Sequence, residues 1–266
     1  MHPAAPATPE LPLVLDGVTI DYGERRAVDR LSLTVRPGEI YGLLGSNGAG
    51  KSSTIKAVVG IVRPRAGSIR VFGEETTANP IGVKERIGYV PETSLLYEGL
   101  TPREFLEFVA GVRRLDGATA AARMRAYASA FRLGSELEEP IATLSLGTRQ
   151  KILLIAAFLH QPRLLVLDEP LNGLDPRTVR LVKELLGRYV AQDGRGVLFS
   201  THTMEVAQEL CRRIGILDRG VLQGEGTLPE LRSRIAQGDA TLEEIYLRLT
   251  REDEGLAETL RSLEGP

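Results

Sequence analysis

Short runs of apolar and β-branched residues open the chain. They predict strands at residues 13–22, 31–35 and 39–44, with the turn Arg36-Pro37-Gly38 between the second and the third. We expect these runs to form an antiparallel β region that leads into a core strand.

A glycine-rich turn comes next and is followed by a helical pattern over Lys51–Val62. Pro64 and Gly67 break this pattern before a further predicted strand at 68–72. These elements form a strand-loop-helix unit.

The middle of the chain, from about Ser94 to Gln161, has a helical pattern. It includes Thr101-Pro102-Arg103-Glu104, the order of an N-cap, a proline in the first turn and an acid three residues after the cap. Pro162 ends the segment. We expect a helical subdomain over about 94–162.

Strands and helices alternate after this segment. The apolar run Leu164–Leu167 is short enough for a strand buried on both faces. The alternation predicts a parallel sheet with crossover helices. The expected elements are a helix at 177–191, a strand at 196–200, a helix at 204–213 and a strand at 214–217.

The two ends of the chain differ from its middle. Residues 1–12 are rich in Ala and Pro, and we expect a disordered tail there. Two amphipathic pieces, at 228–235 and 242–249, predict a helical extension over 227–266 with no recognisable chemistry. The main domain is therefore expected to span 13–226.

Composition limits the class of protein. The chain has 266 residues, 42% of them apolar, which is enough to bury the core of one large domain. Its 33 basic and 35 acidic residues nearly balance, so we expect no nucleic-acid partner. The longest purely apolar stretch, Ile152–Leu159, is far shorter than the roughly 20 residues of a transmembrane helix, so we expect no direct membrane insertion.

The N-terminus lacks the basic start and apolar centre of a secretory signal. The single cysteine, Cys211, excludes an internal disulfide, which agrees with a reducing cytoplasm. We expect Cys211 to be a small apolar residue on a helix.

The turn before the first predicted helix has the spacing of a phosphate-binding loop. Glycines allow a tight turn in which backbone N–H groups point at phosphate oxygens, and the helix N-terminus adds partial positive charge. Lys51 supplies a full charge to the β and γ phosphates, and the Ser52 hydroxyl is a hard ligand suited to Mg²⁺. The residues that match G-x-x-x-x-G-K-[ST] are Gly45, Ser46, Asn47, Gly48, Ala49, Gly50, Lys51 and Ser52, and we include the adjacent Ser53 in the predicted nucleotide site.

Two carboxylates end the predicted strand at 164–167. A parallel sheet places its ligand crevice at the carboxyl ends of its strands, where Asp168 and Glu169 stand. Asp168 is placed to hold Mg²⁺ through its waters, while Glu169 is placed to accept a proton from an attacking water. Seen alone, the pair could equally be a solvated strand end.

A third motif indicates the class. Leu144-Ser145-Leu146-Gly147-Thr148-Arg149-Gln150 lies at a predicted helix start shortly before the Asp-Glu strand. In its motif order, over residues 13 to about 225, the chain resembles the ATP-binding-cassette (ABC) ATPase family, whose signature is usually written LSGGQ. The resemblance implies that Ser145, Leu146, Gly147 and Thr148 serve the γ-phosphate of ATP bound by the opposite subunit of a dimer. Without the family, Ser145 is interpreted as a plain helix N-cap.

Three further features match family positions. Tyr22 resembles the aromatic residue that stacks on adenine, and Leu171-Asn172-Gly173-Leu174-Asp175 resembles the D-loop, which contributes Asp175 to the predicted site. His202 follows a predicted buried strand and resembles the switch histidine, which reaches a γ-phosphate or holds the attacking water. The implied fold is α/β: a P-loop NTPase core with an N-terminal antiparallel β region and an inserted α-helical subdomain.

The chain departs from the family pattern at two motifs. Glu92 stands where the Q-loop normally carries glutamine, which adds a charge near the expected metal; we include Glu92 among the Mg²⁺ ligands and expect hydrolysis with altered metal dependence. The signature has Leu146 for the first glycine and Thr148 for the glutamine.

The resemblance implies an ATP-hydrolysing subunit that uses ATP and Mg²⁺ and powers an ABC transporter through ATP-driven dimer closure. Family likeness favours an exporter, with a homodimer or a related ATPase subunit as partner and a separate transmembrane permease. The expected location is the cytoplasmic face of the cell membrane. The alternatives are an ABC ATPase without a transport role, such as an assembly factor, and a P-loop kinase or nucleotide-binding module, against which the signature and Glu169 argue.

An apolar loop lies between the Q-loop position and the helical segment. It contains Leu95, Leu96, Tyr97 and Leu100, and we expect it to receive a short helix of the permease. The alternative is that these leucines belong to the core.

Overall fold

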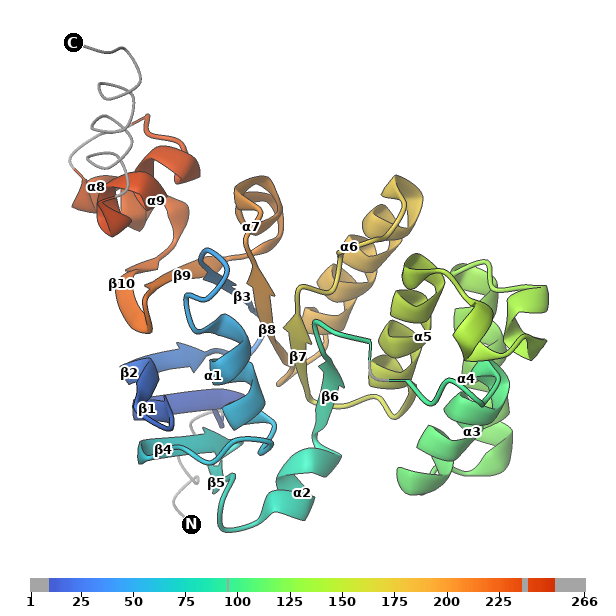
Figure 1. Ribbon diagram of the computed structural model, residues 1–266. Coiled ribbons are helices and arrows are strands. Elements are labelled where there is room, and N and C mark those ends of the chain that lie inside the picture. The colour runs from blue at the N-terminus through green and yellow to red at the C-terminus, as the bar shows by residue number, and fades with distance from the viewer. Residues whose placement is uncertain (1–9, 95, 236–238, 252–266) are drawn as a thin grey trace, which may run out of the picture.

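The computed structural model describes residues 10–94, 96–235 and 239–251. The expected tail at 1–12 and the last part of the expected extension therefore lie mainly outside the described residues, as does Leu95. In the described chain the strands form two sheets, and helices pack against the larger one (Figure 1).

The first sheet is antiparallel and is built from the N-terminal part of the chain. Its order is β2-β1-β4-β5, which confirms the expected antiparallel region. The second strand begins at Arg25 and not at residue 31, because Gly23 (φ 61°) turns the chain so that Tyr22 pairs with Arg25. The strands are β1 Leu13–Tyr22, β2 Arg25–Val35, β4 Ala66–Val71 and β5 Glu74–Glu75.

The second sheet has the order β10-β9-β3-β8-β7-β6. Neighbours from β9 to β6 are parallel, and β10 pairs with β9 antiparallel at one edge. All five residues of β3 and of β7 are buried, which explains why these strands are continuous apolar runs in the sequence. The bounds are β3 Ile40–Leu44, β6 Ile87–Val90, β7 Leu164–Asp168, β8 Gly196–Thr201, β9 Arg213–Asp218 and β10 Val221–Gly226. The two sheets and their helices confirm the α/β fold class.

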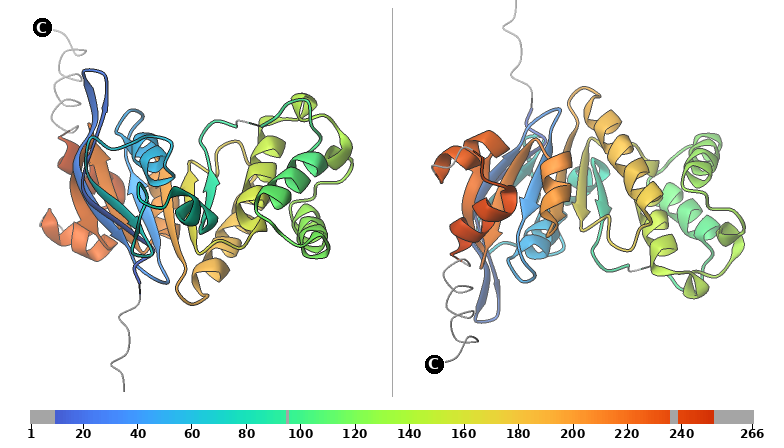
Figure 2. Two further views of the ribbon diagram at one scale, coloured as in Figure 1. Left: turned by 90° about the horizontal axis from the view of Figure 1, so that it is seen from below. Right: turned by 90° about the horizontal axis from the view of Figure 1, so that it is seen from above.

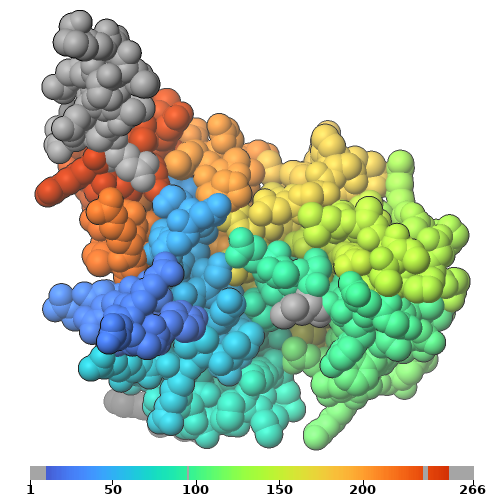
Figure 3. Space-filling view, in the orientation of Figure 1, coloured from blue at the N-terminus to red at the C-terminus, as the bar shows by residue number. Residues whose placement is uncertain are grey.

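Helices α3 Pro102–Val112, α4 Gly117–Ala130 and α5 Leu146–Leu159 pack on one another, away from the antiparallel sheet (Figure 2). Thr101 caps α3 with the predicted capping box to Glu104. In the space-filling view these helices form a green lobe beside the blue and cyan part of the chain that precedes them (Figure 3). Two 3-10 turns, Ser135–Glu138 and Ile141–Thr143, connect α4 to α5.

The other helices are short, with one exception. α6 buries one face that includes Val182 and Leu186 and leaves the other exposed. Their bounds are α1 Lys51–Val58, α2 Pro80–Glu85, α6 Pro176–Val190, α7 Met204–Leu210, α8 Leu228–Arg234 and α9 Leu242–Thr250. None of the helices in the described ranges has the length and apolar character that crossing a bilayer requires.

Helix α1 ends at Val58, four residues before the expected end at Val62. Gly60 has φ 70°, its N–H donates to the Ala57 carbonyl, and the Ile61 N–H donates to the Lys56 carbonyl at 2.8 Å. This is a Schellman C-cap, in which a left-handed glycine ends the helix.

Helix α7 ends at Leu210 and not at residue 213, so the prediction that Cys211 is helical is wrong. Cys211 has an extended backbone (φ −93°, ψ 131°), and the Arg212 N–H donates to the Ile40 carbonyl as the chain enters β9. A Cβ on Gly42 would stand 2.7 Å from Cys211 Sγ, so the thiol fills the space that this glycine leaves. Burial raises the pKa of the thiol to about 12, as expected for a packing residue.

Candidate nucleotide site

The phosphate loop joins β3 to α1 and is held closely on both sides. A Cβ on Gly45 would clash with the Leu217 carbonyl oxygen, and one on Gly50 (φ 109°) would stand 2.7 Å from the Ala27 carbonyl oxygen. Glycine is required at both positions because the backbone passes so close to β9 and β2. The loop is therefore fixed between the two sheets.

A pocket of about 230 Å³ opens beside this loop and brings together most of the predicted site. Tyr22 stands at its edge, and Glu92 and Glu169 face it from other parts of the chain. Arg25 and Ala27 of β2 also line it and were missed in the sequence. The lining residues are Tyr22, Arg25, Ala27, Ser46, Asn47, Gly48, Gly50, Lys51, Ser52, Ser53, Glu92 and Glu169.

The two acids at the end of β7 share one partner on the neighbouring strand. Ser200 of β8 is fully buried, and its Oγ donates to Asp168 Oδ1 at 2.6 Å. The same oxygen accepts from the Glu169 N–H at 3.1 Å. Burial raises the pKa of Asp168, and hydrogen bonds with Ser200 and Ser52 oppose that rise. Sequence reasoning missed Ser200, whose strand neighbour is not visible along the chain.

Glu169 occupies a strained and enclosed position. Its φ is 47°, a left-handed conformation that costs free energy for any residue except glycine. Its carboxylate is 5% exposed, with Lys51 Nζ at 3.4 Å and His202 Nδ1 at 3.0 Å. The predicted general base, phosphate lysine and switch histidine therefore meet at one oxygen.

Ser52 lies between two carboxylates. Its Oγ donates to Glu92 Oε2 at 3.1 Å, and Ser52 is also one of the groups that lower the pKa of Asp168. Hydroxyl and carboxylate oxygens are ligands that suit Mg²⁺. No group of three His, Cys, Asp or Glu side chains forms a ready cation site in the described ranges. The Ser52 hydroxyl and the Glu92 and Asp168 carboxylates suit a cation that would take its other ligands from phosphate oxygens and waters.

The signature residues lie at the start of α5 and outside the pocket. Ser145 is the helix N-cap, and its Oγ accepts from the Thr148 N–H at 3.2 Å, as the plain N-cap interpretation requires. Leu146, which replaces a family glycine, is exposed. A Cβ on Gly147 would stand 2.6 Å from the Gly173 carbonyl oxygen, so the signature packs directly on the expected D-loop.

Hydrogen bonds fix the end of the D-loop and connect α5 to the segment after β7. Asp175 caps α6, and its hydrogen bonds with Thr178 lower the pKa of its carboxyl to about 2, with Lys151 contributing. Gln150 of α5, which sequence reasoning did not assign to the site, is buried, and its Nε2 donates to the Pro170 carbonyl at 3.0 Å. The signature helix thus contacts the segment that follows Glu169.

The apolar loop after Glu92 divides between core and surface. Leu96 is buried and Leu100 packs against the core, so the alternative interpretation holds for these two leucines. Tyr97 is 61% exposed and meets Phe108 edge-on with ring centroids 6.0 Å apart. Leu95 lies outside the described residues.

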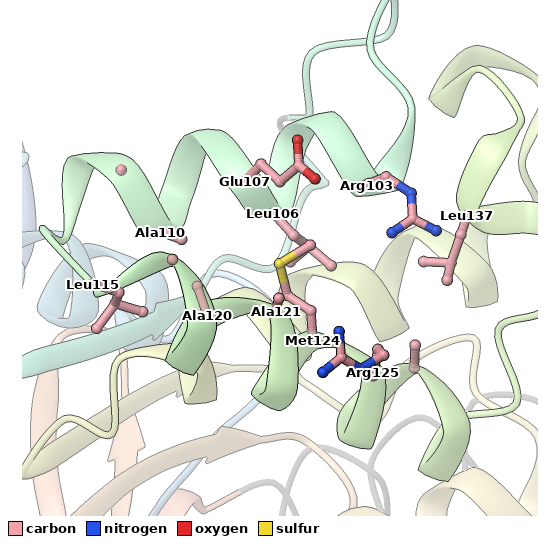
Figure 4. A pocket seen from close by; sticks show the side chains of 13 residues that line it. Arg103, Leu106, Glu107, Ala110, Leu115, Ala120, Ala121, Met124, Arg125 and Leu137 are labelled. Carbon is pink, nitrogen blue, oxygen red and sulfur yellow. The ribbon is translucent and has the colours of Figure 1, made fainter.

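A larger pocket of about 500 Å³ lies between α3 and α4. Figure 4 shows Leu106 and Met124 side by side within it, with Arg103 and Arg125 toward one end. It includes none of the phosphate-loop residues or the acids of β7. Size therefore does not identify the nucleotide site, whereas the chemistry of the smaller pocket does.

Comparisons with known proteins agree with this geometry. The family model described as ABC transporter matches residues 28–172. The chain is 37% identical to the ABC-type transporter ATP-binding protein EcsA of Bacillus subtilis, over 84% of this chain and 90% of that protein. It is also 37% identical to the daunorubicin/doxorubicin resistance ATP-binding protein DrrA of Streptomyces peucetius, over 82% and 66%.

Solved structures give the same result. One described as an ATP-binding subunit of an ABC transporter superposes with a TM-score of 0.85 at 34% identity, covering 90% of this chain and 99% of that chain. An ATP-binding cassette dimer in a post-hydrolysis state, bound to ADP and Pi, shares the fold with a TM-score of 0.74 at 24% identity, covering 81% and 98%. With the phosphate loop, the paired acids and the signature helix in place, the chain belongs to the ABC transporter family, as an ATP-binding and ATP-hydrolysing subunit.

Proposed function

We propose that the pocket at the phosphate loop is where this subunit hydrolyses ATP, with Glu169 as general base. Glu169 is supported in that role by its position at the carboxyl end of β7 and by the approach of His202 Nδ1 to within 3.0 Å of its carboxylate. Lys51 and the loop N–H groups bind the phosphates, and Tyr22, which is partly exposed at the pocket edge, contacts the adenine.

Mg²⁺ is proposed to bind at Ser52, Asp168 and Glu92. The support is the hydrogen bond that Ser52 donates to Glu92 and the effect of Ser52 on Asp168, whose pKa it lowers. When bound, the ion neutralises charge on the β and γ phosphate oxygens. Ser200 holds Asp168 and the backbone of Glu169 in register, so the metal ligand and the base keep a fixed separation.

The catalytic unit is proposed to be a dimer, formed with a second copy or with a related ATPase subunit. Ser145, Leu146, Gly147 and Thr148 lie outside the pocket of their own chain, so they are free to complete the ATP site of the partner. The exposure of Leu146, beside Gly147, supports this surface as the dimer face. The related post-hydrolysis dimer gives a precedent.

A membrane-bound permease is proposed to dock on an exposed apolar surface formed by Ile61, Ile81, Tyr97, Phe108 and Val112, termed the docking surface. Phe108 and Val112 lie four residues apart on α3 and so share one face. Ile61, Ile81 and Val112 line a groove of about 430 Å³. Exposed apolar patches of this kind mark protein contacts.

Docking of this kind would place the subunit at the cytoplasmic face of the cell membrane. The names of relatives such as DrrA, a drug-resistance protein, and of Nod factor export proteins support export as the direction of transport.

The main support for the proposal is that Lys51 Nζ and His202 Nδ1 both lie close to the Glu169 carboxylate. The variant Glu169→Gln tests it. We expect ATP turnover with Mg²⁺ to fall at least about 100-fold, because the amide cannot accept the proton. An ATP-bound dimer is expected to accumulate in gel filtration with light scattering. Glu138→Gln, the same exchange at an exposed carboxylate, is the control. Equal turnover in both variants with no dimer would refute Glu169 as the base.

A further inference from the structure

The helix α9 belongs to the extension for which the sequence gives no chemistry, yet it packs behind the phosphate loop. Its N-terminus is fixed by a capping box between Thr241 and Glu244. Leu242, Ile245 and Tyr246 are buried in a cluster that also contains Leu44, the last residue of β3 and the neighbour of the loop. Figure 1 shows α9 next to β9 and β10, at the end of the molecule opposite α3–α5.

Tyr246 makes a hydrogen bond to the phosphate loop across 200 positions of sequence. The Ser46 N–H donates to the Tyr246 hydroxyl at 3.1 Å. Tyr246 itself is 3% exposed and does not line the nucleotide pocket. Its hydroxyl therefore acts on the loop backbone and does not touch a nucleotide in the pocket.

The peptide group between Gly45 and Ser46 is held at both of its polar ends. Its carbonyl, on Gly45, accepts from Lys51 Nζ at 2.7 Å, and its N–H, on Ser46, donates to Tyr246. In a trans peptide these two groups point in opposite directions, so the two bonds fix the rotation of the plane from either side.

The two hydrogen bonds to this peptide differ in how ATP binding affects them. The Lys51 ammonium is the group proposed to bind phosphates, and two of its three donors already serve the Gly45 and Ser46 carbonyls, so a bound nucleotide draws on the same donors. Tyr246 is 3% exposed, belongs to the buried cluster that also contains Leu44 and Ile216, and does not line the nucleotide pocket, so a nucleotide there does not compete for its hydroxyl. The hydrogen bond from Ser46 N–H to the Tyr246 hydroxyl is therefore the one that remains when Lys51 binds the phosphates.

We propose that Tyr246 is a positioning residue for nucleotide binding. Through its hydrogen bond with Ser46 it fixes the peptide between Gly45 and Ser46, the first of the phosphate loop. Helix α9 thereby contributes to the affinity for nucleotide. The proposal rests on the phosphate loop being the nucleotide site. Removing the hydroxyl frees this peptide to rotate, and binding must then order it.

Tyr246→Phe is the test, because it keeps the ring in the core and removes only the oxygen. We expect the Kd for ATP, measured by calorimetry on the full chain in the presence of Mg²⁺, to rise by about 2- to 10-fold, the range of one hydrogen bond. The KM should rise with it, and kcat at saturating ATP should stay within about twofold of wild type.

Tyr189→Phe is the matched control. Tyr189 is 4% exposed, and its hydroxyl also makes one bond to the backbone, to the Pro162 carbonyl at 2.9 Å, outside the nucleotide pocket. Both variants are expected to lower the melting temperature by similar amounts, but only Tyr246→Phe should weaken nucleotide binding.

Two results would overturn the inference. One is a wild-type Kd for ATP in Tyr246→Phe. The other is an equal rise of the Kd in Tyr189→Phe, which would mean that the loss of stability, and not the position of Tyr246, weakens binding. Lys51→Ala separates this failure from that of the proposed site. If Lys51→Ala loses ATP while Tyr246→Phe binds normally, only the role of Tyr246 is wrong. If Lys51→Ala binds ATP as wild type does, the loop is not the nucleotide site and both proposals fail.

Discussion

Ser200→Ala is expected to weaken the fold and the site together, because one buried hydroxyl serves both acids. The exchange removes the bond to the Asp168 carboxylate and leaves the Glu169 N–H without its acceptor. A hydrogen bond to a charged group contributes about 1.5–3 kcal/mol, and an unsatisfied buried N–H costs about 1–3 kcal/mol. Allowing for relaxation of the site, we expect the free energy of unfolding to fall by about 3 kcal/mol.

Activity should fall as well, for a separate reason. The Ser200 hydroxyl opposes the rise that burial causes in the pKa of Asp168, so its loss raises that pKa further and favours the protonated acid. Glu169 also loses the bond that fixes its backbone. We expect kcat to fall by about 10-fold, less than the roughly 100-fold that a misplacement of about 1 Å costs, because the proposed base would shift by a smaller distance.

Urea unfolding measures the first effect, and steady-state ATP hydrolysis measures the second. Ser32→Ala is the control, because Ser32 Oγ accepts from the Gly17 N–H at 2.9 Å on the exposed side of the antiparallel sheet, without a charged partner. It should cost no more than about 1 kcal/mol and leave kcat unchanged. A Ser200→Ala protein as stable and active as the Ser32→Ala protein would refute the assignment of Ser200 as a shared support.

Three further outcomes are expected. Glu92→Gln removes one of the proposed ligands and should shift the Mg²⁺ titration of ATP hydrolysis to higher concentration; an unchanged titration would exclude Glu92 from the metal site. Tyr97→Arg places a charge on the docking surface and should reduce permease binding in a pull-down without changing the ATPase rate of the isolated chain; intact binding would reject that surface. Burial, with Arg113 and Arg123 nearby, lowers the pKa of His160 from 6.5 to about 4, so the folded state keeps it neutral while the unfolded state takes up a proton. Stability should therefore decrease as the pH falls from 6.5 toward 4, by up to about 2 kcal/mol at pH 5, and urea unfolding of His160→Gln should lack this loss.

Much of the site could be predicted from the sequence because its residues come in contiguous motifs. The phosphate loop runs from Gly45 to Ser52, and Asp168 and Glu169 are adjacent. The spacing within each motif is therefore enough to predict a phosphate-binding loop and a pair of carboxylates. Their strands are buried on both faces and appear as apolar runs.

The supports of the site could not be predicted, since they come from distant parts of the chain. Ser200 reaches Asp168 because β7 and β8 are neighbours in register, and Tyr246 reaches Ser46 because α9 folds back against β9 and β10, beside the loop. The order of strands in a sheet and the packing of a helix belong to the tertiary structure, and local sequence patterns do not predict them.

Among the elements, the early end of α1 could have been predicted. Gly60 is the kind of residue that ends helices, and a helix ending at Val58 follows from it. β10 was missed because most of its residues are not buried, so Val221–Gly226 shows no strong apolar alternation.

The left-handed backbone of Glu169 has a consequence for how this subunit would change under selection for heat resistance. At φ 47° a glycine adopts the conformation freely, whereas a glutamate pays about 1 kcal/mol or more. Glu169→Gly therefore relieves this backbone strain, but it removes the proposed general base and the carboxylate that lies 3.4 Å from the buried Lys51 ammonium. The strain at this position is thus a cost to folding that selection for the proposed catalytic role would keep in place.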